Sequence, residues 1–369
     1  AVALVCLPLI SYALGRLAVE DLECYRELPE SAREGEAIDV RLGIRGKSYL
    51  LGALSVDDRI SEWLVRDDED PAVASAGKNE AAADYRLWAV KRGEHTVGPT
   101  RVKATDSLGF FNFRCDYHRT DRLVVVPRPL HVPGLEVWSS GNFGERQFEG
   151  GGAKGSGIEF HGVREYHHGD ELRRVHWKSS ARHGRLSVIE FEHSEAEDTI
   201  IAIDLRSGSE LGMGRFSSLE YAIRLAAGIA ESAIGVGCQV RLACPGLVGP
   251  AALPGRGPNH LYVILDALAR VRADQAESLP NVVMREAAVM PTGSNLVCLT
   301  SSVDDGYNQC AHMLRPRGVR MHLVLISTPE SGEMDTGRIG LLTACGVSVT
   351  TVKCASDRIF AEVVNKYGA

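Results

Sequence analysis

The sequence has no excess of positive charge. Its 369 residues carry 41 lysines and arginines against 48 aspartates and glutamates, a formal net charge of −7. A domain that binds nucleic acid through its phosphates ordinarily has a basic excess. We therefore expect no nucleic-acid partner. A hydrophobic content of 44% is that of a globular protein, and the length predicts two or three domains.

Paired cysteines are also absent. The nine cysteines are scattered along the chain, and no two of them form a Cys-x-x-Cys pair. This spacing favours neither a zinc ribbon nor a disulfide framework. An odd number of scattered cysteines is typical of a protein in a reducing compartment.

Long hydrophobic runs are rare, and the one uncharged apolar run is at residues 1–14. It is shorter than the ~20 residues that a helix needs to cross a bilayer. It suits the core of a signal peptide, a buried helix or strand, or a membrane helix cut at its start. We expect the last, with residues 1–18 as a truncated transmembrane segment at the cell membrane. Arg16 and the unpaired cysteines predict that the soluble part faces the cytoplasm.

An α+β multidomain fold is predicted for the rest of the chain. In residues 19–130, apolar and polar residues alternate at 38–44, and similar segments follow at 85–90, 100–104 and 123–126. Their spacing predicts an antiparallel β-sandwich domain. Residues 131–160 are rich in glycine and are predicted to be a linker. The order of Lys154 and Gly155 there does not fit a phosphate-binding P-loop.

A second domain is predicted at residues 161–369. Thr199–Ile203 is an apolar run typical of a strand buried on both faces, and a helix follows with Ser217 and Glu220 as a capping box. Strands at 239–243, 295–299, 321–326 and 347–352 then alternate with helices at 261–271, 308–314 and 339–344. The alternation predicts a doubly wound, mostly parallel α/β sheet. Ligands of such sheets bind at the carboxyl ends of the strands, where Asp204 and residues 300–305 lie.

The segment 161–185 concentrates charge, with five of the twelve histidines and six basic residues against three acids. One interpretation is a zinc or iron site at His167 or His168 with Asp170 and His176. A second is a structural clasp that fastens the two domains, with Asp170 paired to arginine and Trp177 packed. A third is an anion or phosphate site, whose donors would be Arg164, Arg173, Arg174, Lys178 and Arg182.

The same segment resembles the signature of the domain-of-unknown-function 58 (DUF58) family. The matching residues are Arg164, Tyr166, Gly169, Asp170, Arg173, His176, Trp177, Lys178 and Arg182. Upstream, Arg92-Gly93, Gly98-Pro99 and the segment 106–111 resemble the family's preceding region. The resemblance implies N-terminal membrane helices, a β-sandwich and then a von Willebrand factor A-like α/β domain. It also implies a MoxR-type AAA+ ATPase as a partner.

A von Willebrand A domain often holds Mg²⁺ through an Asp-x-Ser-x-Ser loop, because Mg²⁺ prefers oxygen ligands. Here the loop begins at Asp204, but Arg206 and Gly208 stand at the two serine positions, with Ser207 and Ser209 displaced by one. Two alternatives follow. One is a degenerate Mg²⁺ site built from Asp204, Ser207, Ser209 and Asp304, or Asp305 in its place. The other, which we expect, is a site without cofactor in which Arg206 pairs with Asp204.

No complete catalytic set accompanies these features. The function expected is therefore that of a non-enzymatic, membrane-tethered adaptor that works with a MoxR-type AAA+ ATPase in the assembly or maturation of cell-envelope or other proteins. One alternative is the binding of an anionic ligand, such as lipid headgroups, by the basic segment. Another is a hydrolase or transferase with His168 or His176 as general base near Asp170, Ser179 and Ser180, although no Gly-x-Ser-x-Gly frame surrounds them.

Overall fold

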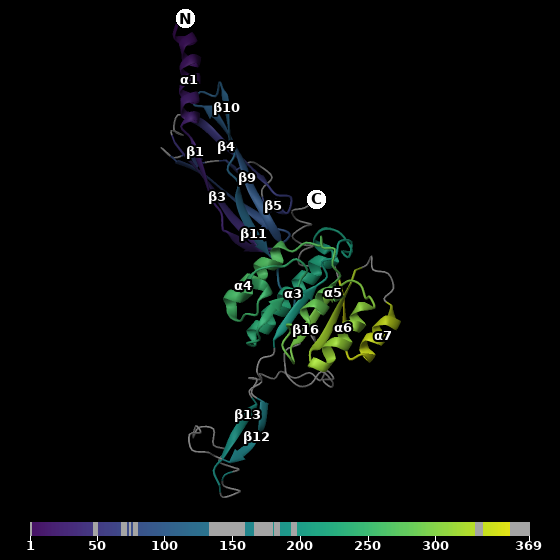
Figure 1. Ribbon diagram of the computed structural model, residues 1–369. Helices are drawn as coiled ribbons and strands as arrows, with labels where there is room; N and C mark the ends of the chain where they lie inside the picture. Colours follow the sequence, from purple (N-terminus) through teal and green to yellow (C-terminus); the bar gives the residue numbers. More distant parts are fainter. Residues whose placement is uncertain are drawn as a thin grey trace.

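The computed structural model describes residues 2–46, 51–67, 72–73, 75–76, 80–132, 159–165, 180, 185–192, 198–328 and 335–354. Four parts can be followed in Figure 1. An N-terminal helix leads into a region of two sheets, which we call the β region (residues 23–126). An α/β body (residues 198–354) follows it, and a separate two-stranded hairpin lies beyond. The predicted linker, residues 131–160, lies almost entirely outside the described residues.

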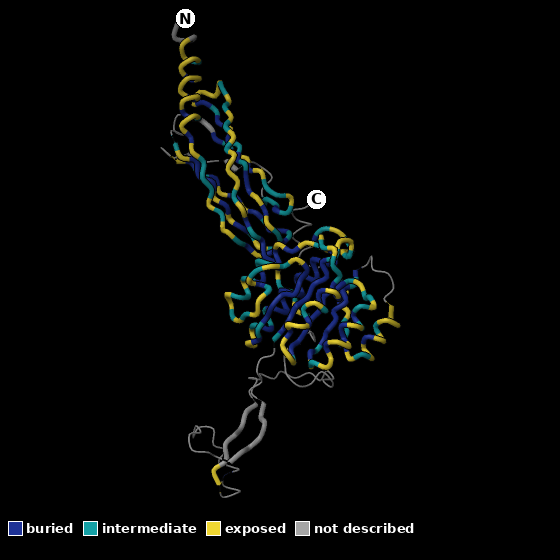
Figure 2. Tube along the Cα trace, in the orientation of Figure 1, coloured by how far each residue is buried: buried dark blue, intermediate teal, exposed yellow. Residues whose placement is uncertain are grey.

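Helix α1 (Val2–Glu20) packs by its C-terminal half on the β region. The Tyr12 ring lies 5.2 Å from that of Phe111 and 5.7 Å from that of Phe113, and the Ser11 hydroxyl donates to Asp106. Away from these contacts the helix exposes apolar residues, among them Leu7, Leu9 and Ile10, and Figure 2 shows much of the described helix as exposed. Within the described residues, no helix has both the length and the apolar composition that crossing a bilayer requires.

The β region consists of two sheets that enclose one apolar cluster. The first contains β1 (Glu23–Glu27), β3 (Ala37–Arg45), β8 (Glu80–Ala89), β5 (Leu64–Arg66) and β7 (Ser75–Ala76); the second contains β2 (Ser31–Arg33), β11 (Asp121–Val126), β9 (Gly93–Asp106), β4 (Leu51–Ile60), β6 (Ala72–Val73) and β10 (Asn112–Tyr117). All pairs are antiparallel except β2 with β11. Ile38 and Val40 of β3 are buried while Asp39 between them is exposed, as the alternation predicts.

The α/β body is built on five parallel strands in the order β15 (Val240–Leu242), β14 (Thr199–Ile203), β16 (Asn295–Thr300), β17 (Arg320–Ser327) and β18 (Ser348–Lys353). Ile201 and Ile203 of β14 belong to one apolar cluster, with α3 (Ser218–Gly235) and α4 (Gly257–Arg270). Ile200 and Ala202 belong to another, with α5 (Leu279–Glu286), α6 (Gly306–Leu314) and α7 (Thr336–Ala344). Every position of β14 is buried, and all but Thr199 are apolar because both faces of the strand are covered (Figure 2).

The helices differ from the sequence prediction in four places: α6 begins at Gly306 rather than 308, and the other three differences have a local cause. Helix α4 begins at Gly257 because Pro258 fits the first turn, where backbone N–H groups have no helical partner. Helix α5 was not predicted, and it too has a proline, Pro280, in its first turn. Helix α7 begins at Thr336 because the Asp335 carboxylate accepts the N–H of Arg338 at 3.1 Å.

Arg92 and Glu220 form a buried ion pair that joins the β region to the α/β body. The Arg92 Nε donates to Glu220 Oε2 at 2.9 Å, and both side chains are 5% exposed or less. Arg92 Nη1 also donates to the carbonyls of Leu268, Ala269 and Val271, which end helix α4. The predicted capping box is therefore only half formed. Ser217 accepts the N–H of Glu220 at 3.3 Å, but the Glu220 carboxylate binds Arg92 instead.

A second contact at the junction is the packing of residues 127–132 along α3. The N–H of Leu130 donates to the carbonyl of Arg224 at 2.9 Å, and the Arg224 Nε donates to Glu34 at 3.0 Å. The approach of the two backbones is close at Gly228, where a Cβ atom would overlap the carbonyl oxygen of Leu130. A glycine is therefore required in the middle of this helix.

We predict that Gly228→Ala destabilises the chain by about 1–3 kcal/mol, because the added methyl group forces the two backbones apart. Gly235→Ala is the matched control in the same helix, since nothing lies within 4 Å of a Cβ there. That control should gain up to about 1 kcal/mol from helix propensity. Denaturant unfolding of both variants measures the difference, and equal stabilities would contradict the packing argument.

The hairpin of β12 (Glu159–Glu165) and β13 (Ser187–Glu192) is antiparallel, with a register irregularity between Phe160 and Gly162. In Figure 1 it lies apart from the β region. Within the described residues, ion pairs that join the β region to the α/β body include Arg92 with Glu220 and Glu34 with Arg224.

Candidate functional site at the carboxyl edge of the parallel sheet

Asp204 and Thr300 lie side by side where two neighbouring strands end. Strand β14 ends at Ile203 and β16 ends at Thr300, and the two strands are paired in parallel. From β14 the chain continues to β15 on one side of the sheet, and β16 lies on the other side. A parallel sheet opens a crevice at the point where its strand order reverses. The sequence prediction of a site at these strand ends thus falls at this reversal point.

The Asp204 carboxylate is 8% exposed and is held from three sides. It accepts the Thr300 hydroxyl at 3.0 Å and the backbone N–H of Arg206 at 3.1 Å. The Arg206 Nη2 lies 4.0 Å from its second oxygen and donates to the Ser302 hydroxyl at 3.4 Å. The guanidinium therefore balances a nearly buried negative charge while its own side chain stays 38% exposed.

The loop after Asp204 is a tight turn that fixes Arg206. Both the N–H and the hydroxyl of Ser209 donate to the carbonyl of Arg206, at 3.0 and 2.7 Å. The turn places Gly208 at φ 81°, a left-handed conformation that strongly favours glycine. A serine at position 208, as in the metal-binding loop, would be strained. The backbone conformation at position 208 therefore disfavours the serine that the metal-binding loop has there.

The Asp304 carboxylate forms a hydrogen bond within its own loop. It accepts the N–H of Gly306 at 2.8 Å, at the start of α6, while Asp305 lies 3.6 Å from Arg338 Nε. Tyr307, next in that helix, is 1% exposed, and burial raises the pKa of its hydroxyl well above the ordinary value.

These donors do not fit Mg²⁺. The ion needs about six oxygen ligands in octahedral geometry, but a guanidinium lies beside the one buried carboxylate. Ser209 donates its hydroxyl to the backbone, and Ser207 is on the exposed side of the turn. Among the described residues, no three or more acidic, histidine or cysteine side chains form a group able to hold a metal. The structure brings Arg206 to Asp204, as the alternative without cofactor expects, and metal binding itself remains to be measured.

An apolar groove of about 490 Å³ adjoins this site. Leu205 and Gln275 line it, and the backbone of Gln275 pairs with that of residues 205–207 through two hydrogen bonds. Its rim exposes Val248 by 92% and Tyr262 by 52%. The other lining residues are Pro245, Gly246, Leu247, Pro250, Ala251, Val263, Asp266, Ala267, Arg270, Val271, Arg272 and Asp274.

The family is decided by the comparison with known proteins. Residues 162–361 match the family described as "Protein of unknown function DUF58". The chain belongs to the DUF58 family. It is 27% identical over 298 residues to the uncharacterized protein YeaD of Bacillus subtilis (strain 168). The aligned region covers 76% of this chain and 70% of YeaD. A solved FixG-related protein from Vibrio parahaemolyticus aligns at 10% identity over 28% of this chain and 96% of its own, with a TM-score of 0.20.

The DUF58 signature lies mostly outside the described residues. Arg164 is the exception: it lies in β12, opposite Val188 of β13. The remaining signature residues are Tyr166, Gly169, Asp170, Arg173, His176, Trp177, Lys178 and Arg182. The interpretations that depend on them, as a metal site, an anion site, a clasp or a general base, remain predictions.

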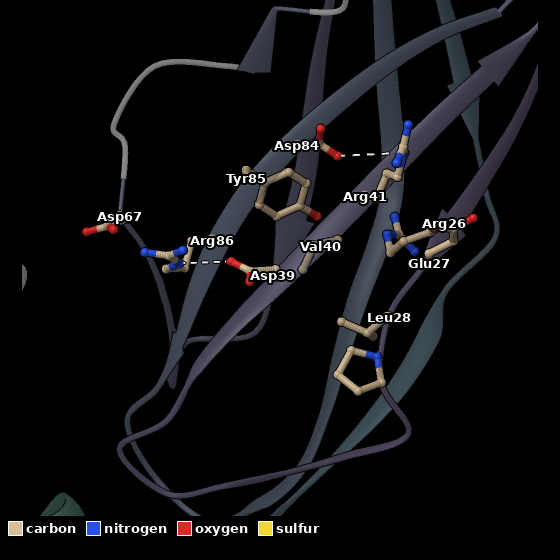
Figure 3. A pocket seen from close by; sticks show the side chains of 11 residues that line it. Arg26, Glu27, Leu28, Asp39, Val40, Arg41, Asp67, Asp84, Tyr85 and Arg86 are labelled. Atoms are coloured by element: carbon tan, nitrogen blue, oxygen red, sulfur yellow. Dashed lines mark hydrogen bonds and ion pairs between the residues drawn. The ribbon is translucent and has the colours of Figure 1, made fainter.

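Another cavity lies on the outer face of the β region (Figure 3). Its volume is about 920 Å³, and its lining arginines are already bound to carboxylates. Arg86 pairs with Asp39 at 2.9 Å, Arg41 with Asp84 at 3.8 Å and Arg26 with Asp58 at 2.7 Å. The smaller groove beside Arg206 is therefore the better candidate.

Two features of the DUF58 chain were not predicted from the sequence. Arg92 was singled out for its resemblance to the family's preceding region, and not as a residue that joins the β region to the α/β body. The groove was not predicted either, although its loop has two apolar residues in sequence, Leu247 and Val248, between Gly246 and Gly249.

Proposed function

We propose that this DUF58 chain is a membrane-tethered adaptor that binds a protein partner at the carboxyl edge of its parallel sheet. In this proposal the α/β body is a von Willebrand A-like domain and the β region a β-sandwich. The partner is the MoxR-type AAA+ ATPase that the family resemblance implies, and the pair acts in the assembly or maturation of other proteins. Five parallel strands with helices on both faces support the first assignment.

The observation that carries the proposal is the apolar groove beside Arg206. The loop after β15 exposes Val248 by 92%, and Tyr262 of α4 is 52% exposed; both line this groove. Apolar side chains gathered beside a groove with a polar rim are typical of protein-binding surfaces. Arg206 supplies the polar group next to them.

Helix α1 supports the tether. Its outer face exposes Leu7, Leu9, Ile10, Leu14 and Leu17, each by 43% or more. The C-terminal end of the same helix is fixed to the β region, which in turn is joined to the body by the Arg92–Glu220 pair. In the proposed arrangement the membrane holds α1 while the groove faces the partner.

We predict that Val248→Asp weakens binding of the full chain to the MoxR-type ATPase of the same organism about tenfold, because a buried valine contributes roughly that factor. Val289→Asp is the matched control, since Val289 is 70% exposed on the segment that leads to the amino end of β16. Affinity co-purification and titration of the two purified proteins measure the effect. A native chain that does not bind the ATPase, or two variants that bind equally, would refute the proposal.

A further inference from the structure

We infer that Arg206 is the partner-binding cation of this edge, and that it binds an acidic side chain of a bound peptide segment without a metal ion. The inference rests on the proposed function and adds to it the chemistry of recognition. Where a von Willebrand A loop would use Mg²⁺, this chain has a guanidinium 4.0 Å from the buried Asp204 carboxylate.

The guanidinium has donors left for a ligand. Its Nη2 is directed to Asp204 and Ser302, whereas its Nε and Nη1 donate to no acceptor within the described residues. An arginine has five N–H donors in a planar fork that matches a carboxylate in two-point geometry. The side chain is 38% exposed, so a carboxylate can reach it from solvent.

The position of Arg206 is fixed before any partner binds. Its N–H donates to Asp204, and its carbonyl accepts two hydrogen bonds from Ser209. The backbone of Gln275 pairs with its neighbours Leu205 and Ser207. Less conformational entropy is therefore lost when a partner binds, which favours a hydrogen bond between Arg206 and a carboxylate.

The adjoining groove defines the rest of the ligand. Leu205 and Gln275 connect Arg206 to its apolar lining, in which Val248 and Tyr262 are exposed. Arg272 adds a second exposed cation on the rim, while Asp266 is already paired with Arg270 at 3.1 Å and Asp274 accepts from Gln275. Charge and shape together fit a peptide segment of a protein partner with one aspartate or glutamate followed by apolar side chains.

The experiment is selection from a display library of short random peptides on the full chain, in buffer with EDTA. We expect the enriched peptides that compete at the groove, identified by loss of binding to Val248→Asp, to share an acidic residue next to apolar ones. Changing that residue to its amide should weaken binding about tenfold, as should Arg206→Gln. Arg315→Gln, an exposed arginine at the C-terminal end of α6, is the control and should bind as the native chain does.

The outcomes separate the two proposals. Apolar peptides that bind at the groove without an acidic residue, or that bind equally to Arg206→Gln, would overturn the Arg206 inference and leave the adaptor function standing. Binding that appears only when Mg²⁺ replaces EDTA would also overturn it. If no enriched peptide loses binding to Val248→Asp, the groove is not a peptide-binding surface and both proposals are refuted. A thermal unfolding scan of Arg206→Gln verifies that the variant is folded.

Discussion

Replacement of Arg92 by methionine is expected to destabilise the folded chain by about 3 kcal/mol, because the buried Glu220 carboxylate loses its nearer cation and keeps only Lys91, whose Nζ lies 3.5 Å away. Arg92 is 5% exposed, and Glu220, whose carboxylate it binds through Nε and Nη2, is 2% exposed. Three carbonyls at the end of α4 would lose their donor as well. Burial lowers the pKa of Arg92, and the Glu220 carboxylate opposes that shift.

Two further variants make the Arg92 prediction specific. Arg122→Met removes a 79% exposed arginine of the same β region from its contact with Glu94, and should cost less than about 1 kcal/mol. The double variant Arg92→Met with Glu220→Met should recover much of the loss, because no buried charge is then left unpaired. Denaturant unfolding measures the free energies. A loss for Arg92→Met as small as that of Arg122→Met would contradict the assigned role.

The stability of the chain is expected to fall by about 3 kcal/mol as the pH drops from 7 to 4, through His322 alone. His322 lies in the buried strand β17, is 5% exposed, and contacts the Thr350 hydroxyl at 3.0 Å. Burial lowers its pKa from 6.5 to about 4. The unfolded chain therefore binds the proton first as the pH falls. Stability is complete above about pH 6.5 and is lost progressively as the pH falls towards the folded pKa near 4.

His322→Gln tests this by keeping a hydrogen-bonding group opposite Thr350 without a titrating one. The free energy of unfolding of this variant should fall about 3 kcal/mol less than that of the native chain over the same pH interval. His118→Gln, at an exposed position of the β region, should follow the native pH dependence. If His322→Gln and the native chain lose stability in parallel, the acid sensitivity comes from other groups.

The junction has a consequence for the proposed adaptor. Arg92 and Glu34 from the β region bind Glu220 and Arg224 of a single helix, α3. Helix α3 follows the loop that carries Asp204 and Arg206. Arg92 also donates to the carbonyls that end helix α4. The β region is therefore joined to the α/β body by buried contacts on both α3 and α4, close to the proposed binding edge.

Local pattern was enough to predict much of the secondary structure. Alternation at 38–44 gave β3, and the unbroken apolar run at 199–203 gave β14, because period and burial are properties of neighbouring residues. The contact between Arg206 and Asp204 could also be predicted as one of two alternatives, since the two residues are only two positions apart in one loop. The signature residues identified the DUF58 family directly, and the match over residues 162–361 confirms it.

The sequence by itself thus determined the mixed α/β organisation, the family, and the loop in which Arg206 stands by Asp204. Tertiary structure alone decided that Glu220 binds Arg92 rather than capping its own helix, because the two are 128 positions apart and local pattern cannot show which distant charge a carboxylate meets. It also decided the groove, whose walls come from loops and a helix brought together only when the sheet orders its strands. Periodicity is a local property, whereas ion pairs and cavities depend on how distant segments pack.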